Sequence, residues 1–107
     1  MGYIVGMKES IETHEFVKWI DGLKDVQALA RIQARIYRLI HGLPGDVQPV
    51  GEGVSALRID YGPGYRVYYI QQGSVVIILL AGGDKKTQDK DIQTALGLAR
   101  NLERGTP

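Results

Sequence analysis

The sequence feature that most constrains the fold is an unbroken apolar run over residues 75–81. A strand with one solvated face alternates apolar and polar side chains, whereas a strand that is apolar at every position is covered on both faces. The run is also far too short to cross a bilayer as a helix. The chain is therefore expected to build a sheet whose central strand has packed layers above and below it.

Two amphipathic helices are predicted before this strand, preceded by a short strand over residues 3–8. The first helix begins after Thr13, a suitable N-cap, and ends near Gly22. Its apolar face consists of Phe16, Trp19, Ile20 and Leu23. The second helix is expected over residues 25–41 and is ended by Gly42. Its apolar stripe consists of Leu29, Ile32, Ile36, Leu39 and Ile40.

The pattern then changes to that of antiparallel strands. Large apolar or aromatic side chains stand at every second position from Leu57 to Tyr61. A Gly-Pro-Gly turn signal follows at residues 62–64, and residues 65–71 are rich in aromatic and β-branched side chains. A second turn signal at residues 72–74 separates this segment from the apolar run. These signals predict a meander of three or four strands.

The segment 82–87 is expected to break the apolar strand and to lead into a last helix with Thr87 as its N-cap. The apolar stripe of that helix consists of Ile92, Ala95, Leu96 and Ala99. The 107 residues then make one α+β domain. We predict an N-terminal helical hairpin packed on one face of an antiparallel sheet of about four strands, with the C-terminal helix shielding part of the other face.

Composition narrows the possible functions. The chain has no cysteine, which excludes disulfides and thiolate metal sites. His14 and His41 stand alone, without a second ligand at metal spacing, so we expect no metal and no cofactor. The net charge is +1, and any polyanion must therefore be met by a local basic patch. No secretory leader is visible at the start, which predicts a cytoplasmic protein without membrane contact.

The predicted hairpin is the first place where chemistry is expected. If its loop is residues 62–64, Asp60 lies opposite Arg66, Arg58 lies opposite Tyr68, and all four side chains share one polar face. Leu57, Ile59, Val67 and Tyr69 would then face the core. Two guanidiniums on one face are suited to holding phosphate. The alternative is an exposed Asp60–Arg66 ion pair, and the pattern alone favours that alternative.

Two further basic groups have similar alternatives. Lys85 and Lys86 stand where a helix begins, so they and the backbone N–H groups there are suited to an anion, unless the segment is an ordinary connection with solvated lysines. Without other evidence the ordinary connection is preferred. Arg31, Arg35 and Arg38 form a stripe on the second helix. The stripe is either a solvated face or a contact for RNA phosphates or an acidic partner.

Residues 53–69, with the run Arg-Ile-Asp-Tyr-Gly-Pro-Gly-Tyr-Arg at 58–66, resemble the core of HigB-like addiction-module killer proteins. These proteins belong to the RelE/ParE toxin superfamily. Residues 79–88 and 16–20 resemble the same branch, so the likeness covers nearly the whole chain. The resemblance implies one RelE/ParE-like toxin domain over residues 1–107, with the twisted antiparallel sheet and the helices described above.

The resemblance also implies an activity. The chain would be an mRNA interferase, an endoribonuclease that cuts mRNA on the ribosome and inhibits translation without a metal. The RNA 2′-OH would attack the adjacent phosphate, with Arg66 stabilising the transition state and Arg58 holding the phosphate. The residues expected to bind RNA are Lys85, Lys86, Tyr68, Arg31, Arg35 and Arg38. Relatives have more lysines on the first hairpin strand, and this chain has neither tyrosine nor histidine after Lys86; Asp60 and Asp89 are therefore the candidates for the general base.

The implied partners are a cognate antitoxin with a helix-turn-helix, the ribosome and its mRNA. Operator DNA would be contacted only through the antitoxin. Two alternatives stay open: a ParE-like inhibitor that binds DNA gyrase without cutting RNA, and a non-toxic remnant that only binds its antitoxin. The paired arginines of the hairpin favour the nuclease.

Overall fold

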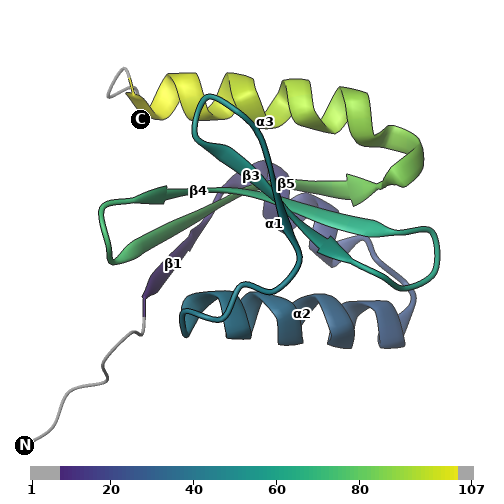
Figure 1. The fold of residues 1–107 in the computed structure, drawn as a ribbon. Helices are drawn as coiled ribbons and strands as arrows, with labels where there is room; N and C mark the ends of the chain where they lie inside the picture. The colour runs from purple at the N-terminus through teal and green to yellow at the C-terminus, as the bar shows by residue number, and fades with distance from the viewer. Residues whose placement is uncertain (1–7, 104–107) are drawn as a thin grey trace, which may run out of the picture.

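The computed structural model describes residues 8–103, which form a five-stranded mixed sheet with three α-helices (Figure 1). In chain order the elements are β1 (Glu9–Glu12), α1 (His14–Asp21), α2 (Val26–Ile40), β2 (Val47–Gly51), β3 (Val54–Ile59), β4 (Tyr65–Gln72), β5 (Val76–Asp84), the 3-10 turn η1 (Lys85–Thr87) and α3 (Gln88–Glu103). The order of strands across the sheet is β1-β5-β4-β3-β2. The last four strands form the predicted antiparallel meander.

The sheet differs from the prediction in its first strand. It has five strands rather than about four, and it is mixed, because β1 pairs in parallel with β5. Most of the strand predicted over residues 3–8 lies outside the described residues, and Lys8 is not in a strand. All four side chains of β1 are exposed, so no apolar alternation marks this strand in the sequence. Backbone pairing with β5, not burial, defines it.

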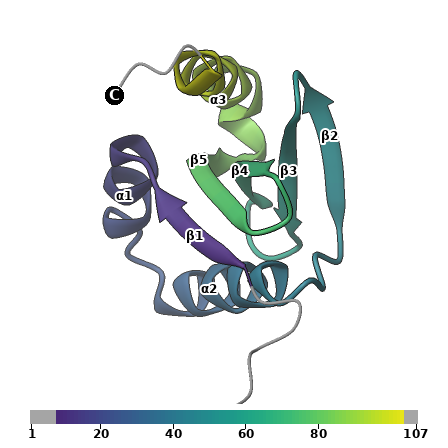
Figure 2. The same ribbon diagram turned by 90° about the vertical axis from the view of Figure 1, so that its left-hand side faces the viewer.

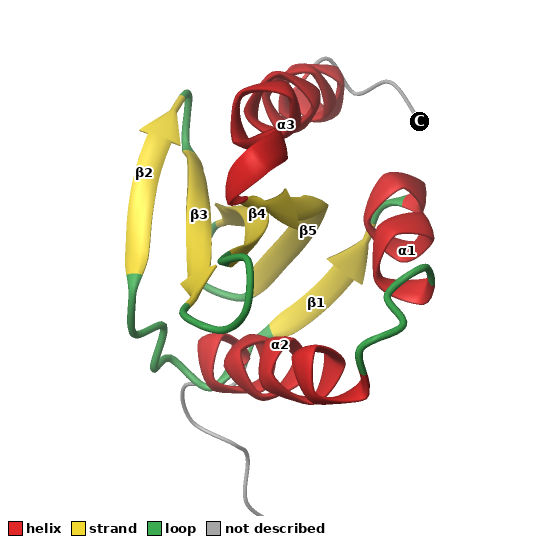
Figure 3. Cartoon of the chain, turned by 90° about the vertical axis from the view of Figure 1, so that its right-hand side faces the viewer, coloured by secondary structure: helices red, strands yellow, loops and turns green. Residues whose placement is uncertain are grey.

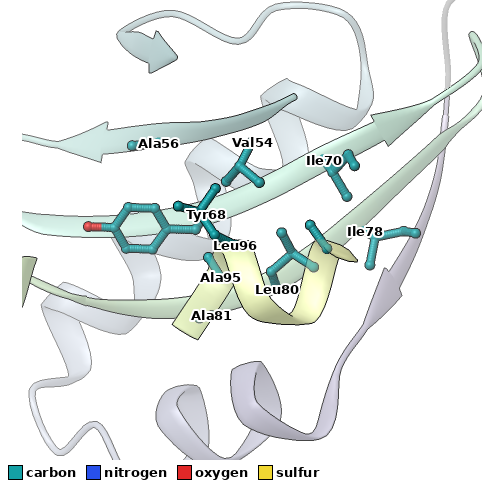
Figure 4. Packing of buried hydrophobic residues seen from close by; sticks show 10 residues of the cluster. Val54, Ala56, Tyr68, Ile70, Ile78, Leu80, Ala81, Ala95 and Leu96 are labelled. Atoms are coloured by element: carbon teal, nitrogen blue, oxygen red, sulfur yellow. The ribbon is translucent and has the colours of Figure 1, made fainter. Parts of the chain in front are cut away.

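Helices cover both faces of the sheet. α1 and α2 lie on one face and α3 on the other (Figures 2 and 3). The core beneath α1 and α2 contains Phe16, Ile32, Leu39, Leu57, Ile59, Val67, Tyr69, Ile77 and Leu79. The core beneath α3 contains Val54, Ala56, Tyr68, Ile70, Ile78, Leu80, Ala81, Ala95, Leu96 and Ala99 (Figure 4). Because β5 contributes to both cores, the prediction of a strand covered on both faces is confirmed.

The ends of α1 agree with the prediction of Thr13 as N-cap and Gly22 as the end of the helix. The Thr13 hydroxyl accepts a hydrogen bond from the Phe16 N–H (3.1 Å) and donates one to the Leu80 carbonyl (2.6 Å), which ties the start of α1 to β5. The Asp25 side chain caps α2, and Gly22 follows the last residue of α1. Within the part of the chain that the structure describes, no helix is long and apolar enough to cross a membrane.

The predicted break after β5 is wrong in its position. The strand continues through Gly82 and Gly83 to Asp84, all of which pair with the beginning of β4. Asp84, not Thr87, is the N-cap: its carboxylate accepts from the N–H groups of Lys86 (2.8 Å) and Thr87 (3.2 Å). The two glycines are needed for close packing and not to end the strand. A Cβ at Gly82 would lie 2.1 Å from the Trp19 ring.

Candidate functional site

The register of the β3–β4 hairpin places its side chains differently from the prediction. Arg58 pairs with Arg66 rather than with Tyr68, because the connecting loop comprises residues 60–64 instead of three residues. A shift of two residues keeps every strand side chain on its expected face, since strands alternate with a period of two. Arg58, Arg66 and Tyr68 therefore share a face, whereas Asp60 lies in the loop.

Four of the predicted site residues come together at the end of this hairpin. A shallow depression of about 270 Å³ is lined by Arg58, Asp60, Arg66 and Lys85, with Asp46 at its side. We call it the hairpin depression. Its lining comes from the β3–β4 hairpin, the residue before β2 and the first residue of η1. Figure 1 shows the β3–β4 loop at the same end of the molecule as the end of β5. The pairing of β4 with β5 carries Lys85 to this place, although it is distant in sequence from Arg58.

Arg58 is held by two residues of the β2 edge that the sequence did not identify. Its guanidinium donates to the Asp46 carboxylate (2.7 and 3.0 Å) and to the Gln48 side-chain carbonyl (3.0 Å). The predicted exposed ion pair between Asp60 and Arg66 is absent from the described residues, and Arg58–Asp46 is found instead. Arg58 is therefore oriented toward the depression with part of its donor capacity already used.

Arg66 has more of its donors available. Its guanidinium has one hydrogen bond within residues 8–103, a long one of 3.3 Å from Nη1 to the Gly64 carbonyl. A guanidinium carries five N–H donors and stays protonated, so Arg66 can present a fork to a planar or tetrahedral anion. Lys85 is exposed at the same rim. Arg66 is the best-placed phosphate ligand of the depression.

Three carboxylates near the site differ in their surroundings. Asp60 is exposed and lines the depression, whereas Asp89 is exposed in the first turn of α3 and does not line it. Asp91, which the sequence did not single out, lies over Gly83, where a Cβ would be 1.7 Å from its Oδ2. Burial raises the pKa of Asp91, and the hydrogen bond from the Thr87 hydroxyl (2.5 Å) opposes that rise. Asp60 is thus the predicted base that the structure places beside the arginines.

Of the two interpretations of the segment after β5, the geometry favours the ordinary connection, which the sequence pattern also preferred, over an anion site at the beginning of the helix. The N–H groups of η1 are used by the Asp84 carboxylate, which acts as an internal anion at this point. Lys85 lines the hairpin depression and Lys86 does not. The described residues also contain no group of three or more His, Cys, Asp or Glu side chains that could hold a metal ion.

The prediction that Tyr68 contacts RNA is wrong. Its side chain is 0% exposed and packs beneath α3 against Ala95 and Leu96 (Figure 4). Burial raises the pKa of Tyr68 to about 12, with a further rise from Asp91 and a smaller opposing effect from Arg66. The hydroxyl has no hydrogen-bond partner within the described residues. Strand alternation placed Tyr68 correctly on the arginine face, but a helix distant in sequence covers that part of the face.

Replacing Tyr68 with phenylalanine should stabilise the protein. The change removes a buried hydroxyl that lacks a partner, and such a group costs about 1–3 kcal/mol of desolvation. Urea unfolding should show a free energy of unfolding higher by about 1 kcal/mol or more. Tyr37→Phe is the matched control, because Tyr37 is 64% exposed and should change stability by less than about 0.5 kcal/mol. A loss of stability in Tyr68→Phe would show that the hydroxyl is satisfied in solution.

The arginines of α2 lie beside the hairpin depression and not within it. They line a second depression of about 320 Å³, formed by Arg31, Ala34, Arg35, Arg38, Ile59 and Asp60. We call it the helix depression. Arg35 is not a solvated side chain: its guanidinium donates to the carbonyls of Arg58 (2.5 Å) and Pro44 (2.9 Å). Arg31 and Arg38 are exposed.

Comparison with known proteins gives one informative result. No family model matches the chain. A Haemophilus influenzae protein (strain ATCC 51907 / DSM 11121 / KW20 / Rd), described as an uncharacterized protein, is 52% identical over 90 residues, which make up 84% of this chain and 91% of the relative. Identity at this level over nearly the whole of both chains shows common descent. The chain therefore belongs to the same family as this Haemophilus influenzae protein.

Proposed function

We propose that this chain is the toxin of a type II toxin–antitoxin module, a HigB-like member of the RelE/ParE superfamily that cuts mRNA on the ribosome. The observation that carries the proposal is the hairpin depression, in which Arg58, Arg66 and Lys85 gather around Asp60. Three cations line the depression with two carboxylates, of which Asp46 is paired with Arg58. Cations beside an unpaired carboxylate suit a phosphodiester and a proton acceptor next to it. The α+β class, with helices on both faces of the sheet, supports the proposal, although the sheet is mixed and has five strands rather than about four.

The proposed reaction needs no metal. The 2′-oxygen of the RNA forms a bond to the adjacent phosphorus, its proton passes to the Asp60 carboxylate, and the bond to the 5′-oxygen breaks. That oxygen takes up a proton as it leaves. Negative charge builds on the phosphoryl oxygens, and Arg66, whose donors are largely uncommitted, stabilises it. Arg58, oriented by Asp46, holds the same phosphate in the ground state.

The proposal includes the partners that such a module requires. A cognate antitoxin, with a helix-turn-helix, neutralises the toxin and brings it to operator DNA. The ribosome presents the mRNA to the hairpin depression in the cytoplasm.

Induced expression without an antitoxin tests this function. We expect growth to stop, and mapping of RNA 5′ ends should reveal cuts within codons of translated mRNAs. Co-expression of the antitoxin encoded beside the toxin gene should restore growth and remove the cuts. Growth arrest with intact transcripts, DNA damage and trapped gyrase would instead identify a ParE-like inhibitor. Normal growth with intact transcripts would identify a remnant that only binds its antitoxin.

A further inference from the structure

The hairpin depression and the helix depression are neighbours that share a wall. Ile59 and Asp60 line both of them, so one surface runs from Arg66 across the β3–β4 loop to α2. The two hollows have similar volumes, about 270 and 320 Å³. A ligand that fills the first can therefore continue into the second without leaving the protein surface.

The helix depression carries an excess of positive charge. Arg31, Arg35 and Arg38 line it, and Asp60 is its one acidic residue. Within residues 8–103 none of these three arginines forms an ion pair with a carboxylate. The pKa of Arg35 is lowered first by burial and then by the nearby charge of Arg38, although the group stays protonated. Like charges held together in this way are stabilised by an anion between them.

Arg35 makes the spacing of the two depressions rigid. Its guanidinium reaches from α2 to the carbonyl of Arg58 in β3, whose own side chain lines the hairpin depression. A second hydrogen bond fixes the same guanidinium to the Pro44 carbonyl before β2. A polyanion that binds both depressions therefore meets cations already held at a fixed separation, which reduces the ordering cost of binding.

A stacked pair lies at the edge of this surface. The guanidinium carbon of Arg31 is 4.7 Å from the centre of the Tyr61 ring. The Tyr61 hydroxyl donates to Asp25 (3.3 Å), which fixes the ring against the start of α2. Guanidinium and aromatic planes beside phosphate-binding cations are the groups on which unpaired bases stack. An acidic peptide would use the charges but not this plane.

We propose that the two depressions form one track for single-stranded RNA. The reacting phosphate lies in the hairpin depression, the following phosphates lie along Arg35 and Arg38, and an unpaired base stacks on the Arg31–Tyr61 pair. This track extends the proposed nuclease site and rests on that function. Tyr61 thereby gains a role in binding that its sequence position did not suggest.

Fluorescence anisotropy with labelled single-stranded RNA tests the track. The probes are 2′-O-methyl RNAs, which cannot be cut, of about three and about nine nucleotides, because one such groove holds roughly 4–16 nucleotides. Arg31→Ala with Arg38→Ala should weaken binding of the long probe roughly tenfold or more and reduce its log–log salt slope by about 0.7 per arginine. Tyr61→Leu should weaken it roughly fivefold or more. Neither variant should affect the short probe.

The control variant is Lys18→Ala, which removes an exposed cation of α1 that lines neither depression. Circular dichroism should show that all variants keep the fold. Equal losses for both probes, or no loss for either, would overturn the track. A polyglutamate peptide is the competing probe. The track would also be overturned if binding of this peptide depended on Arg31 and Arg38 while binding of RNA did not. Transcript mapping tests the proposed nuclease function separately from the track. If mRNAs are still cut, but binding of the long probe does not depend on Arg31 and Arg38, the nuclease function holds and the track is wrong.

Discussion

Replacing Arg66 with alanine is expected to lower the rate of RNA cleavage by about 10²- to 10³-fold, which should abolish growth arrest. Among the described residues, Arg66 holds the largest set of uncommitted donors in the hairpin depression, and its one hydrogen bond there, to the Gly64 carbonyl, is long. Its contribution is therefore made to the ligand rather than to the fold. Arg66→Lys should recover only part of the activity, because an ammonium keeps the charge but loses the fork.

Growth of induced cultures, RNA 5′-end mapping and circular dichroism together measure this effect. The control is Arg100→Ala, which removes an exposed arginine that is paired with Glu52 at 2.5 Å. That variant should stay toxic, because Arg100 does not line the hairpin depression. Antitoxin binding by Arg66→Ala should persist. If Arg66→Ala remained fully toxic while folded, the hairpin depression would not be the active surface.

Gly82→Ala should be a strongly disruptive single-methyl change, destabilising the protein by about 1–3 kcal/mol or more. The added Cβ would lie 2.1, 2.3 and 2.5 Å from three atoms of the Trp19 ring. The ring contacts Phe16 and Tyr65, with centroid distances of 5.9 and 6.4 Å, so it can move away only by changing these contacts. Displacing Tyr65 would also move Arg66, its neighbour in β4, so activity should fall together with stability.

Gly97→Ala provides the opposite expectation and serves as the control. A Cβ at Gly97 would meet no atom within 4 Å, and the residue lies inside α3. Alanine favours a helix interior over glycine by about 0.5–1 kcal/mol, so this variant should gain stability. Urea unfolding of both variants measures the change in the free energy of unfolding, which should fall for Gly82→Ala and rise for Gly97→Ala. Equal, small effects would mean that Trp19 moves freely away from the sheet.

The elements that could be predicted from sequence are those whose burial pattern is local. Spacing along the chain placed the apolar stripes of the helices, and the Thr13 cap follows from a hydroxyl that accepts within one turn. Strand β1 (Glu9–Glu12) has no such pattern, because its side chains are exposed and its existence depends on the distant β5. The predicted register of the β3–β4 hairpin was wrong because the loop spans residues 60–64 and not 62–64. Glycine and proline indicate a turn but do not determine its length.

The sequence predicted some of the residues that line the hairpin depression, but not its geometry. Arg58, Arg66 and Lys85 were expected to act together, and they line one depression. The pairing of Arg58 with Asp46 and the burial of Tyr68 could not be foreseen, since each depends on which distant segment packs over the hairpin. Contacts between segments distant in sequence produce no periodic pattern of apolar residues from which a single sequence could predict them.

The position of β5 in both cores has a consequence for how the protein is made. Of the strands in residues 8–103, β5 (Val76–Asp84) is the last to leave the ribosome, yet its alternate residues complete the cores on both sides of the sheet. A nascent chain that ends before it has no finished apolar layer, and it also lacks Lys85 at the hairpin depression. Folding therefore waits for the synthesis of β5 and is cooperative, dominated by contacts of long sequence separation. The complete hairpin depression, with Lys85 at its rim, forms only after this strand has been made.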